Sequence, residues 1–329
     1  MKSHQRLLFF GFVTLLSGLA LSADGASYPE KSIRFVIPYP PGGSADVVAR
    51  ILGHELAQAM GQQVVMDNRG GATGIVALQL VARSAPDGYT IMLASAGPNA
   101  INPSIYRKLP YDPLVDFAPI TLAMMVPQIV VVNPALNAKT IQELISLAKE
   151  KPGALTYASA GTGSSFHLSV ELFKSLSGLN MTHVPYKGAG PALNDVVAGH
   201  VQLMFPSAPS VMSLVKSGRL RAIAVTTIKR VSALPDMPTV SESGVPGYEA
   251  VSWFGVVAPA STPVQIIDTL HGHFGRILAL QRVKERFIGL GAEIVSSTQT
   301  EFQAYLKNEV EKWRKVAKFA GVTLELEQQ

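Results

Sequence analysis

Two segments of the chain have the same order of strand, glycine-containing turn and helix, and this repetition constrains the fold more than any other feature. In residues 36–50 an apolar stretch leads through two prolines and Gly42-Gly43 into a helical pattern that begins at Ser44. In residues 155–171 another apolar stretch leads through Gly161-Thr-Gly163 into a second helical pattern. Strand and helix patterns alternate in the same way along the rest of the chain. This alternation predicts an α/β protein with largely parallel sheets.

A helix that begins directly after such a turn can bind an anion. Its first N–H groups have no acceptor inside the helix, and the helix macrodipole makes this end positive. We predict that Ser44 is the N-cap of the first helix. Two turns far apart in the sequence predict two lobes that hold one small carboxylate or phosphate between them. The predicted donors are Gly42, Gly43 and Ser44 in one lobe, and Ala160, Gly161, Thr162, Gly163 and Ser164 in the other.

The first 26 residues have the pattern of a secretory signal peptide. Lys2 and Arg6 form a basic start, residues 7–21 are apolar, and residues 22–26 are mostly small. The apolar run is shorter than the roughly 20 residues that span a bilayer, so a signal peptide is favoured over an uncleaved anchor. We expect cleavage between residues 22 and 26 and export of the mature chain.

The sequence contains no cysteine. It therefore predicts no disulfide, and no lipid-bearing cysteine after the signal peptide. An exported receptor without a lipid anchor would diffuse away from a cell with a single membrane. We therefore expect the periplasm of a Gram-negative cell.

Charge and histidine spacing argue against nucleic-acid binding and against a metal site. The chain has 28 basic and 23 acidic residues, and the basic ones are scattered among acids, as on a solvated surface. His54-Glu55 begins like a zinc-protease motif, but Gln58 stands where the second histidine would be. We predict no metal, no cofactor and no nucleic-acid partner.

The length of the mature chain predicts two domains. We expect lobe 1 to contain residues 27–124 and 228–329, and lobe 2 to contain residues 125–227. The chain would then cross between the lobes twice. Ser95, at the end of the strand that follows the turn at residues 86–88, is expected to form a third wall of the cleft.

Two residues near the predicted anion site allow more than one interpretation. Ser164 and His167 are three apart and could form a hydrolytic dyad, but no acid orients the histidine. We favour Ser164 as a helix cap or ligand contact and His167 as a polar residue at the cleft edge. Asp46 can either pair with Arg50 one turn later or face a donor group of the ligand, and the sequence leaves both readings open.

Several ordered motifs resemble those of one family, the Bug-type (TctC-like) extracytoplasmic solute receptors of tripartite tricarboxylate transporters. The resemblance covers nearly the whole mature chain. Its motifs are Tyr39-Pro-Pro-Gly-Gly-Ser-Ala-Asp46, Asn68-Arg-Gly-Gly-Ala-Thr-Gly74, Asp87-Gly-Tyr89, Tyr157-Ala-Ser-Ala-Gly-Thr-Gly-Ser164 with His167, His183-Val-Pro-Tyr-Lys-Gly188, Pro235-Asp-Met-Pro-Thr-Val240 and Pro246-Gly-Tyr-Glu249.

The resemblance implies a type II periplasmic-binding-protein fold with two α/β lobes and a hinge that the chain crosses twice. It also implies that residues 39–46 and 160–164 hold a ligand carboxylate through N–H groups, hydroxyls and bridging waters. Many relatives have an aspartate after the Met-Phe of a later strand, where this chain has Pro206-Ser207. If Ser207 meets the far end of the ligand, a plain carboxylate is favoured over an amine-bearing ligand.

We therefore expect a monomeric periplasmic receptor that captures a small organic carboxylate and passes it to integral-membrane transporter subunits. The alternatives are a periplasmic sensor subunit for the same ligand class and, less favoured, a hydrolase that uses Ser164 and His167. Trp253 is expected near the cleft, because it lies late in the sequence on an apolar strand.

Overall fold

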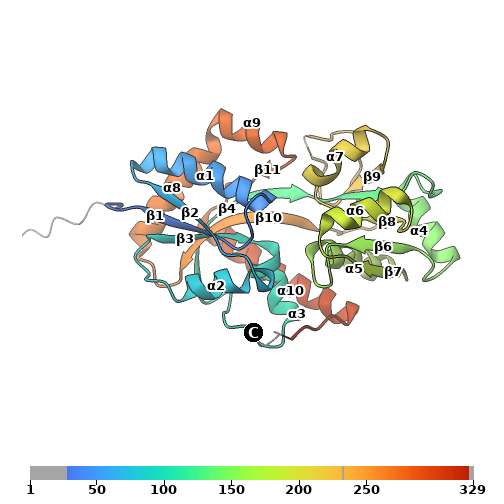
Figure 1. Cartoon of the computed structure of the whole chain (residues 1–329), viewed down its shortest axis with the longest axis horizontal. Coiled ribbons are helices and arrows are strands. Elements are labelled where there is room, and N and C mark those ends of the chain that lie inside the picture. Colours follow the sequence, from blue (N-terminus) through green and yellow to red (C-terminus); the bar gives the residue numbers. More distant parts are fainter. Residues whose placement is uncertain (1–27, 232, 326–329) are drawn as a thin grey trace, which may run out of the picture.

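The computed structural model describes residues 28–231 and 233–325. The predicted signal peptide, residues 1–26, lies outside the described residues. The described part of the chain forms two sheets, one toward each end of the molecule, with helices packed around them (Figure 1).

The first sheet has six strands in the order β11-β4-β10-β3-β1-β2. Parallel pairing joins β1 to both β2 and β3, whereas β10 runs antiparallel to β3 and β4. The strands are β1 (Ile33–Ile37), β2 (Val64–Asn68), β3 (Thr90–Ser95), β4 (Phe117–Pro127), β10 (Val251–Pro259) and β11 (Glu293–Ile294).

The second sheet has five strands in the order β7-β6-β8-β5-β9. Here β6 pairs in parallel with β7 and β8, and β5 runs antiparallel to β8 and β9. The strands are β5 (Ile129–Val132), β6 (Thr156–Ser159), β7 (Thr182–Pro185), β8 (Leu203–Met204) and β9 (Arg221–Val225).

The prediction of largely parallel sheets is wrong, because both sheets are mixed. The antiparallel pairs involve the strands through which the chain passes between the sheets: β4 continues into β5 across Gln128, and the chain returns from β9 to β10. Near the two crossings the segments are hydrogen-bonded to each other. Gln128 N donates to Thr226 Oγ1 over 2.9 Å, and Thr226 N donates to Gln128 O over 3.0 Å. The two crossings therefore form one hydrogen-bonded unit.

The described residues form ten α-helices. They are α1 (Ser44–Met60), α2 (Ile75–Ala82), α3 (Asn102–Ile105), α4 (Ile141–Glu150), α5 (Ser165–Ser177), α6 (Ala189–Ala198), α7 (Ala208–Lys216), α8 (Val264–Ala279), α9 (Gln281–Gly289) and α10 (Gln299–Ala320). Two short helical turns, η1 (Ala72–Gly74) and η2 (Gly97–Ile101), complete the set.

The helices divide the core into three apolar clusters. One cluster lies between the first sheet and helices α1, α8 and α9, and another lies between the second sheet and helices α6 and α7. The third runs along both sheets and includes apolar residues of α2, α4, α5 and α10. Helix α10 packs against β4 of the first sheet and against α5 beside the second (Figure 1). The apolar face of α10, which includes Phe302, Leu306, Val310 and Trp313, is buried.

None of the helices in the described residues combines the length and the apolar character that crossing a membrane requires.

Candidate functional site

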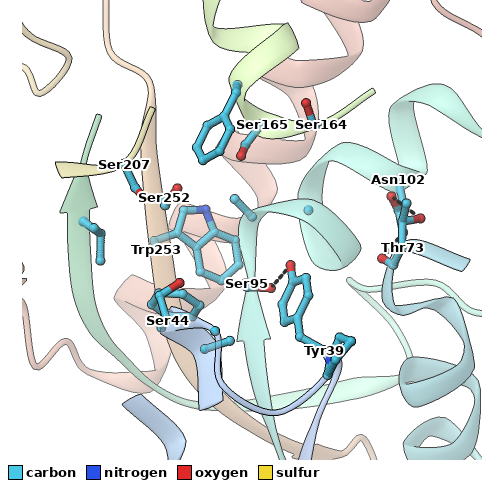
Figure 2. A pocket seen from close by; sticks show the side chains of 18 of the residues that line it. Tyr39, Ser44, Thr73, Ser95, Asn102, Ser164, Ser165, Ser207, Ser252 and Trp253 are labelled. Atoms are coloured by element: carbon cyan, nitrogen blue, oxygen red, sulfur yellow. Dashed lines mark hydrogen bonds between the residues drawn. The ribbon is translucent and has the colours of Figure 1, made fainter. Parts of the chain in front are cut away.

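A cavity of about 480 Å³ lies at the boundary between the parts of the chain that carry the two sheets. This volume is within the range of sites that hold small organic molecules. Its lining comes from both parts: Tyr39, Pro40, Pro41, Gly43, Ser44, Ala45, Thr73, Ser95, Ala96, Gly97, Asn102, Val126, Ser252, Trp253 and Phe254 on one side, and Gly163, Ser164, Ser165, Phe166 and Ser207 on the other. Figure 2 shows Ser44 and Ser165 on opposite sides of the indole of Trp253.

Helix α1 begins at one wall of this cavity. Its N-cap is Gly43, whose carbonyl accepts the first helical hydrogen bond from Val47 N over 3.1 Å. The prediction that Ser44 is the N-cap is therefore wrong by one residue. No acceptor among the described residues is bonded to the backbone N–H of Ser44 or Ala45. Both residues line the cavity, so these N–H groups are available to a ligand.

The carboxylate of Asp46 holds the loop before α1 in place. It accepts hydrogen bonds from Gly42 N at 3.0 Å, Arg50 Nε at 2.9 Å and Asn68 Nδ2 at 3.0 Å. The Arg50 guanidinium, together with the Gly42 and Asn68 donors, lowers the pKa of Asp46 to about 2 against the opposing effect of burial. Asp46 does not line the cavity, so the structure supports its pairing with Arg50 over contact with a ligand.

The second glycine turn is held together by its own N–H groups. Gly161 N donates to Ser159 Oγ at 3.1 Å, and Ser164 N donates to Gly161 O at 3.1 Å. Gly163 N donates to Nδ1 of His167 at 3.1 Å. The prediction that the N–H groups of Gly42, Gly161, Gly163 and Ser164 are free is therefore wrong, because each has an acceptor in the loop or helix beside it.

The N–H groups available to a ligand lie just after the second turn, in the first residues of α5. Ser164 is the N-cap of α5, and its hydroxyl accepts from His167 N. Within residues 28–231 and 233–325, the N–H groups of Ser165 and Phe166 have no intramolecular acceptor. Both residues line the cavity. The N-termini of α1 and α5 therefore open into the same space from opposite sides.

His167 lies behind this turn and away from the cavity. Only 4% of its surface is exposed, and its ring stacks on that of His183 with 3.9 Å between the ring centroids. Burial lowers the pKa of His167 to about 3, and the neighbouring His183 and Lys174 act in the same direction. The neutral ring accepts from Gly163 through Nδ1, and its Nε2 lies 3.9 Å from Glu171 Oε1. Neither ring nitrogen is hydrogen-bonded to the Ser164 hydroxyl, so the two side chains do not form a dyad.

Trp253 forms the back wall of the cavity and is fully buried. Its Nε1 donates to Glu309 Oε2 of α10 at 3.0 Å, and Trp313 Nε1 donates to the same oxygen at 3.0 Å. Lys312 pairs with the other carboxylate oxygen. Helix α10 therefore fixes the orientation of the indole, and the expectation that Trp253 lies near the cleft is confirmed.

Tyr39 closes the cavity on another side. Its hydroxyl and that of Ser95 are 3.0 Å apart and share a hydrogen bond, which Figure 2 marks with a dashed line. Burial raises the pKa of Tyr39 above its usual value, so the side chain is neutral at physiological pH. Ser95 is held in turn by the bond from its N–H to Asn99 Oδ1, at 3.0 Å. The expected third wall is therefore present.

The electrostatic character of the cavity comes from the backbone. Apart from the neutral Tyr39, no Lys, Arg, His, Asp, Glu or other ionisable side chain is among the lining residues of this described cavity. The positive ends of α1 and α5 reach it, and so does Ser207, the N-cap of α7. Elsewhere too, the described residues contain no group of three or more His, Asp or Glu side chains placed to hold a metal ion. The arrangement suits a small anion.

The structure brings seven of the predicted ligand-binding residues to the cavity: Tyr39, Gly43, Ser44, Ser95, Gly163, Ser164 and Ser207. Six others lie outside the lining: Gly42, Asp46, Ala160, Gly161, Thr162 and His167. Sequence reasoning did not single out Ala45, although it lies within residues 39–46, and it missed Ser165, Phe166 and Ser252. The first three follow from the general rule that the free N–H groups lie after the N-cap, whereas Ser252 has no signal of its own in the sequence.

Known proteins resemble this chain over nearly its whole length. A family model for the "Tripartite tricarboxylate transporter family receptor" matches residues 48–322. Protein BugT of Bordetella pertussis is 35% identical over 325 residues, which are 98% of this chain and 100% of BugT.

Solved structures agree with this. R. palustris Rpa4515 with adipate is 37% identical, with a TM-score of 0.79 over 91% of this chain and 100% of that one. MatC from Rhodopseudomonas palustris with bound malate is 30% identical, with a TM-score of 0.75 over 88% of this chain and 99% of that one. These likenesses confirm the predicted type II periplasmic-binding-protein fold. The chain belongs to the receptor family of the tripartite tricarboxylate transporters.

Proposed function

We propose that this protein is a periplasmic receptor that captures a small organic carboxylate and delivers it to a membrane transporter. One observation carries the proposal: the N-termini of α1 and α5 meet across a cavity that has no charged side chain in its lining. The free N–H groups of Ser44, Ala45, Ser165 and Phe166 are then the donors for one carboxylate. A carboxylate is satisfied by several such donors without a Lys or Arg.

Bound ligands of the relatives support this choice of ligand class. Rpa4515 has been solved with adipate and MatC with malate, and both are small dicarboxylates. The apolar and hydroxyl-bearing walls of the cavity suit the short carbon chain of such an acid. We therefore propose that the ligand of this chain is also a small organic acid.

The same geometry gives a mechanism for capture. We propose that the parts of the chain that carry the first and the second sheet move as two lobes about the paired crossings at Gln128 and Thr226, near the boundaries predicted from the sequence. A carboxylate that contacts α1 in one lobe and α5 in the other stabilises the closed arrangement over the open one. The membrane subunits would then recognise the closed conformation, which the bound ligand stabilises.

We propose residues 1–26 as the signal peptide that exports the chain to the periplasm, where it acts as a monomer without a lipid anchor. Its partners would be the integral-membrane subunits of the transporter. We further propose that the protein is not an enzyme, since His167 supports the glycine turn and does not bond to Ser164. A sensor subunit for the same ligand would share this site and differ only in its partner.

A thermal-denaturation screen against small carboxylates tests the proposal. An acid present at about 100 times its dissociation constant should stabilise the protein by roughly 2.7 kcal/mol. The acid should be recovered unchanged after prolonged incubation. Turnover of an ester or amide that Ser164→Ala abolishes would favour the hydrolase instead, and failure of every acid to bind would contradict the receptor function.

A further inference from the structure

Two histidines stack on each other behind the glycine turn that precedes α5. We propose that His183, acting through the hydroxyl of Ser159, positions this turn for ligand capture. It does at Gly161 what His167 does at Gly163. The inference rests on the receptor function proposed above and adds two residues to it. Neither of the two is among the lining residues of the described cavity, so both act as positioning residues and not as ligand contacts.

The hydroxyl of Ser159 connects the turn to His183. Ser159 is the last residue of β6 and is completely buried. Its Oγ accepts from Gly161 N at 3.1 Å and shares a hydrogen bond of 2.7 Å with His183 Nε2. A serine hydroxyl has one proton and two accepting positions, so it can hold both partners at once. The bond to His183 therefore restricts the Ser159 side chain to the position that accepts from Gly161 N.

The position of His183 follows from the pairing of two strands. The register places His183 of β7 beside Tyr157 of β6. Ser159 follows Tyr157 by two residues, and residues two apart on a strand share one face of the sheet. The ring of His183 stacks on that of Tyr157 with 4.9 Å between the centroids, and on that of His167 with 3.9 Å. These two contacts fix the plane of the ring and with it the direction of Nε2.

The ring of His183 is neutral at physiological pH. Burial lowers its pKa to about 4, the carboxylate of Glu171 opposes this shift, and the ammonium of Lys174 reinforces it. The Glu171 carboxylate is already bonded to the hydroxyl of Tyr157 and to Lys174. Since the ring of His167 is neutral as well, the two imidazoles stack without repulsion between like charges.

The turn needs this support because its backbone is unusual. Gly161 has φ of +125° and Gly163 has φ of +79°, values that other residues rarely adopt. Glycine also adopts many other conformations, so a turn built from two glycines is not rigid by itself. The bonds to Ser159 and His167 hold one conformation at each end of the turn.

The conformation of the turn sets the direction of the donors on α5. The free N–H groups of Ser165 and Phe166 follow the turn directly, so they face the cavity only while the turn keeps its form. If the turn occupies other conformations for part of the time, the apparent dissociation constant rises as the binding-competent fraction falls. A hydrogen bond of about 1 kcal/mol corresponds to about a fivefold change in that constant.

Two substitutions of His183 separate its hydrogen bond from its stacking. His183→Phe keeps a flat ring without nitrogen, whereas His183→Gln places an amide near the position of Nε2 and has no ring to stack. Isothermal titration calorimetry with adipate and with malate gives the affinities. His183→Phe should bind at least about fivefold more weakly than the wild type, and His183→Gln should bind within about twofold of it. Equal affinities in the wild type and His183→Phe overturn the inference, and so does a loss in His183→Gln as large as that in His183→Phe.

Ser159→Ala provides the second test, with Thr156→Val as its control. Both residues lie on β6, and Thr156 Oγ1 donates to Gln202 Oε1 at 2.6 Å at the other end of the strand. Ser159→Ala should bind the two acids at least about tenfold more weakly, whereas Thr156→Val should keep the wild-type affinity. In the protein without ligand, amide hydrogen exchange at Gly161 should be faster in Ser159→Ala than in Thr156→Val. If Ser159→Ala lowers only the free energy of unfolding and leaves affinity and exchange as in Thr156→Val, the inference is overturned.

These measurements separate the positioning role from the receptor function. If the wild type binds an acid and the affinity of the variants is unchanged, only the positioning role is overturned. The tightest acid of the thermal-denaturation screen replaces adipate and malate if neither of them binds. If no acid of that screen binds the wild type, the receptor function is contradicted and the positioning role with it. If His183→Phe does not fold, the comparison of Ser159→Ala with Thr156→Val decides.

Discussion

Gly163 donates its backbone N–H to Nδ1 of His167 across 3.1 Å, and this bond fixes the turn from which α5 begins. The acceptor role requires that Nδ1 carry no proton. Since His167 is 4% exposed and stacks on His183, the neutral form is also the one that burial favours. His167, which the sequence places at the edge of the cleft, thus supports the ligand site from behind.

This arrangement predicts a loss of stability in mild acid. The pKa of His167 falls from 6.5 to about 3 on folding and that of His183 to about 4, in both cases mainly through burial. The unfolded chain therefore binds protons that the folded chain excludes, so stability decreases as pH falls from about 6.5 toward these values. Each histidine contributes at most about 1.4 kcal/mol per pH unit in its window. Urea unfolding at pH 7, 6, 5 and 4.5 measures this slope.

The matched variant for that experiment is His167→Asn. The Asn side-chain oxygen can accept from Gly163 N in place of Nδ1, but it does not titrate. The variant should therefore show a shallower dependence of unfolding free energy on pH between 6.5 and 4.5. The same slope as the wild type would mean that His167 is not excluded from protonation in the folded state.

Replacement of Asp46 by asparagine should loosen the loop before α1. Asp46→Asn removes the charge that binds Arg50 and turns a donor amide toward either Gly42 or Asn68. We expect a loss of about 1–3 kcal/mol in unfolding free energy and weaker ligand binding. In the wild type, the contribution of the Asp46 carboxylate to the free energy of unfolding should disappear only as pH falls from about 4 to about 2, because its pKa is lowered to about 2.

Arg50→Gln is the control for this variant. The Arg50 side chain is 52% exposed, so its ion pair with Asp46 should contribute less than about 1 kcal/mol. A larger loss in Arg50→Gln than in Asp46→Asn would show that the ion pair, and not the bonds to Gly42 and Asn68, maintains the loop.

Glu309 should stabilise the back wall of the cavity. Glu309→Ala leaves the two buried indole N–H groups of Trp253 and Trp313 without their acceptor, which should cost about 2–5 kcal/mol. The tryptophan emission should change at the same time, because these are the only two tryptophans of the chain. Glu309→Gln retains an oxygen that can accept from both indoles. It should destabilise the protein less than Glu309→Ala does, as measured by urea unfolding. Equal destabilisation by the two variants would point to the Lys312 pair instead.

A methyl group at Gly163 should impair binding. The backbone there has φ of +79°, and a Cβ would lie 2.7 Å from Ile105 Cδ1. Gly163→Ala must therefore strain the backbone and displace a buried side chain, and we expect at least about a tenfold loss of affinity for a carboxylate. Gly275→Ala, in the interior of α8 with nothing near its Cβ, should bind normally and gain about 0.5–1 kcal/mol in stability. Unchanged affinity in Gly163→Ala would show that this turn does not shape the site.

Local patterns were enough to predict most elements of the fold. Strands and helices alternate as predicted, and α1 begins at Ser44, where the helical pattern begins. The mixed pairing of the sheets was not predictable in this way. It depends on which strands carry the chain between the two sheets, and that is a property of topology and not of any single segment.

The site shows the same division between local and tertiary information. The sequence located both helix N-termini, because glycine turns before helices are local signals. It did not reveal that Asp46 accepts a hydrogen bond from Gly42 N, or that His167 accepts one from Gly163 N. Both bonds depend on side-chain orientation in the folded protein. The free donors are consequently the residues that follow each cap.

A crystal structure of the protein with its tightest-binding carboxylate would show whether both helix N-termini bind the acid. We expect the carboxylate oxygens to lie within hydrogen-bonding distance of the N–H groups of Ser44 or Ala45 on α1 and of Ser165 or Phe166 on α5. A complex in which the acid contacts only one of these helix ends, or lies elsewhere in the molecule, would contradict the proposed ligand site.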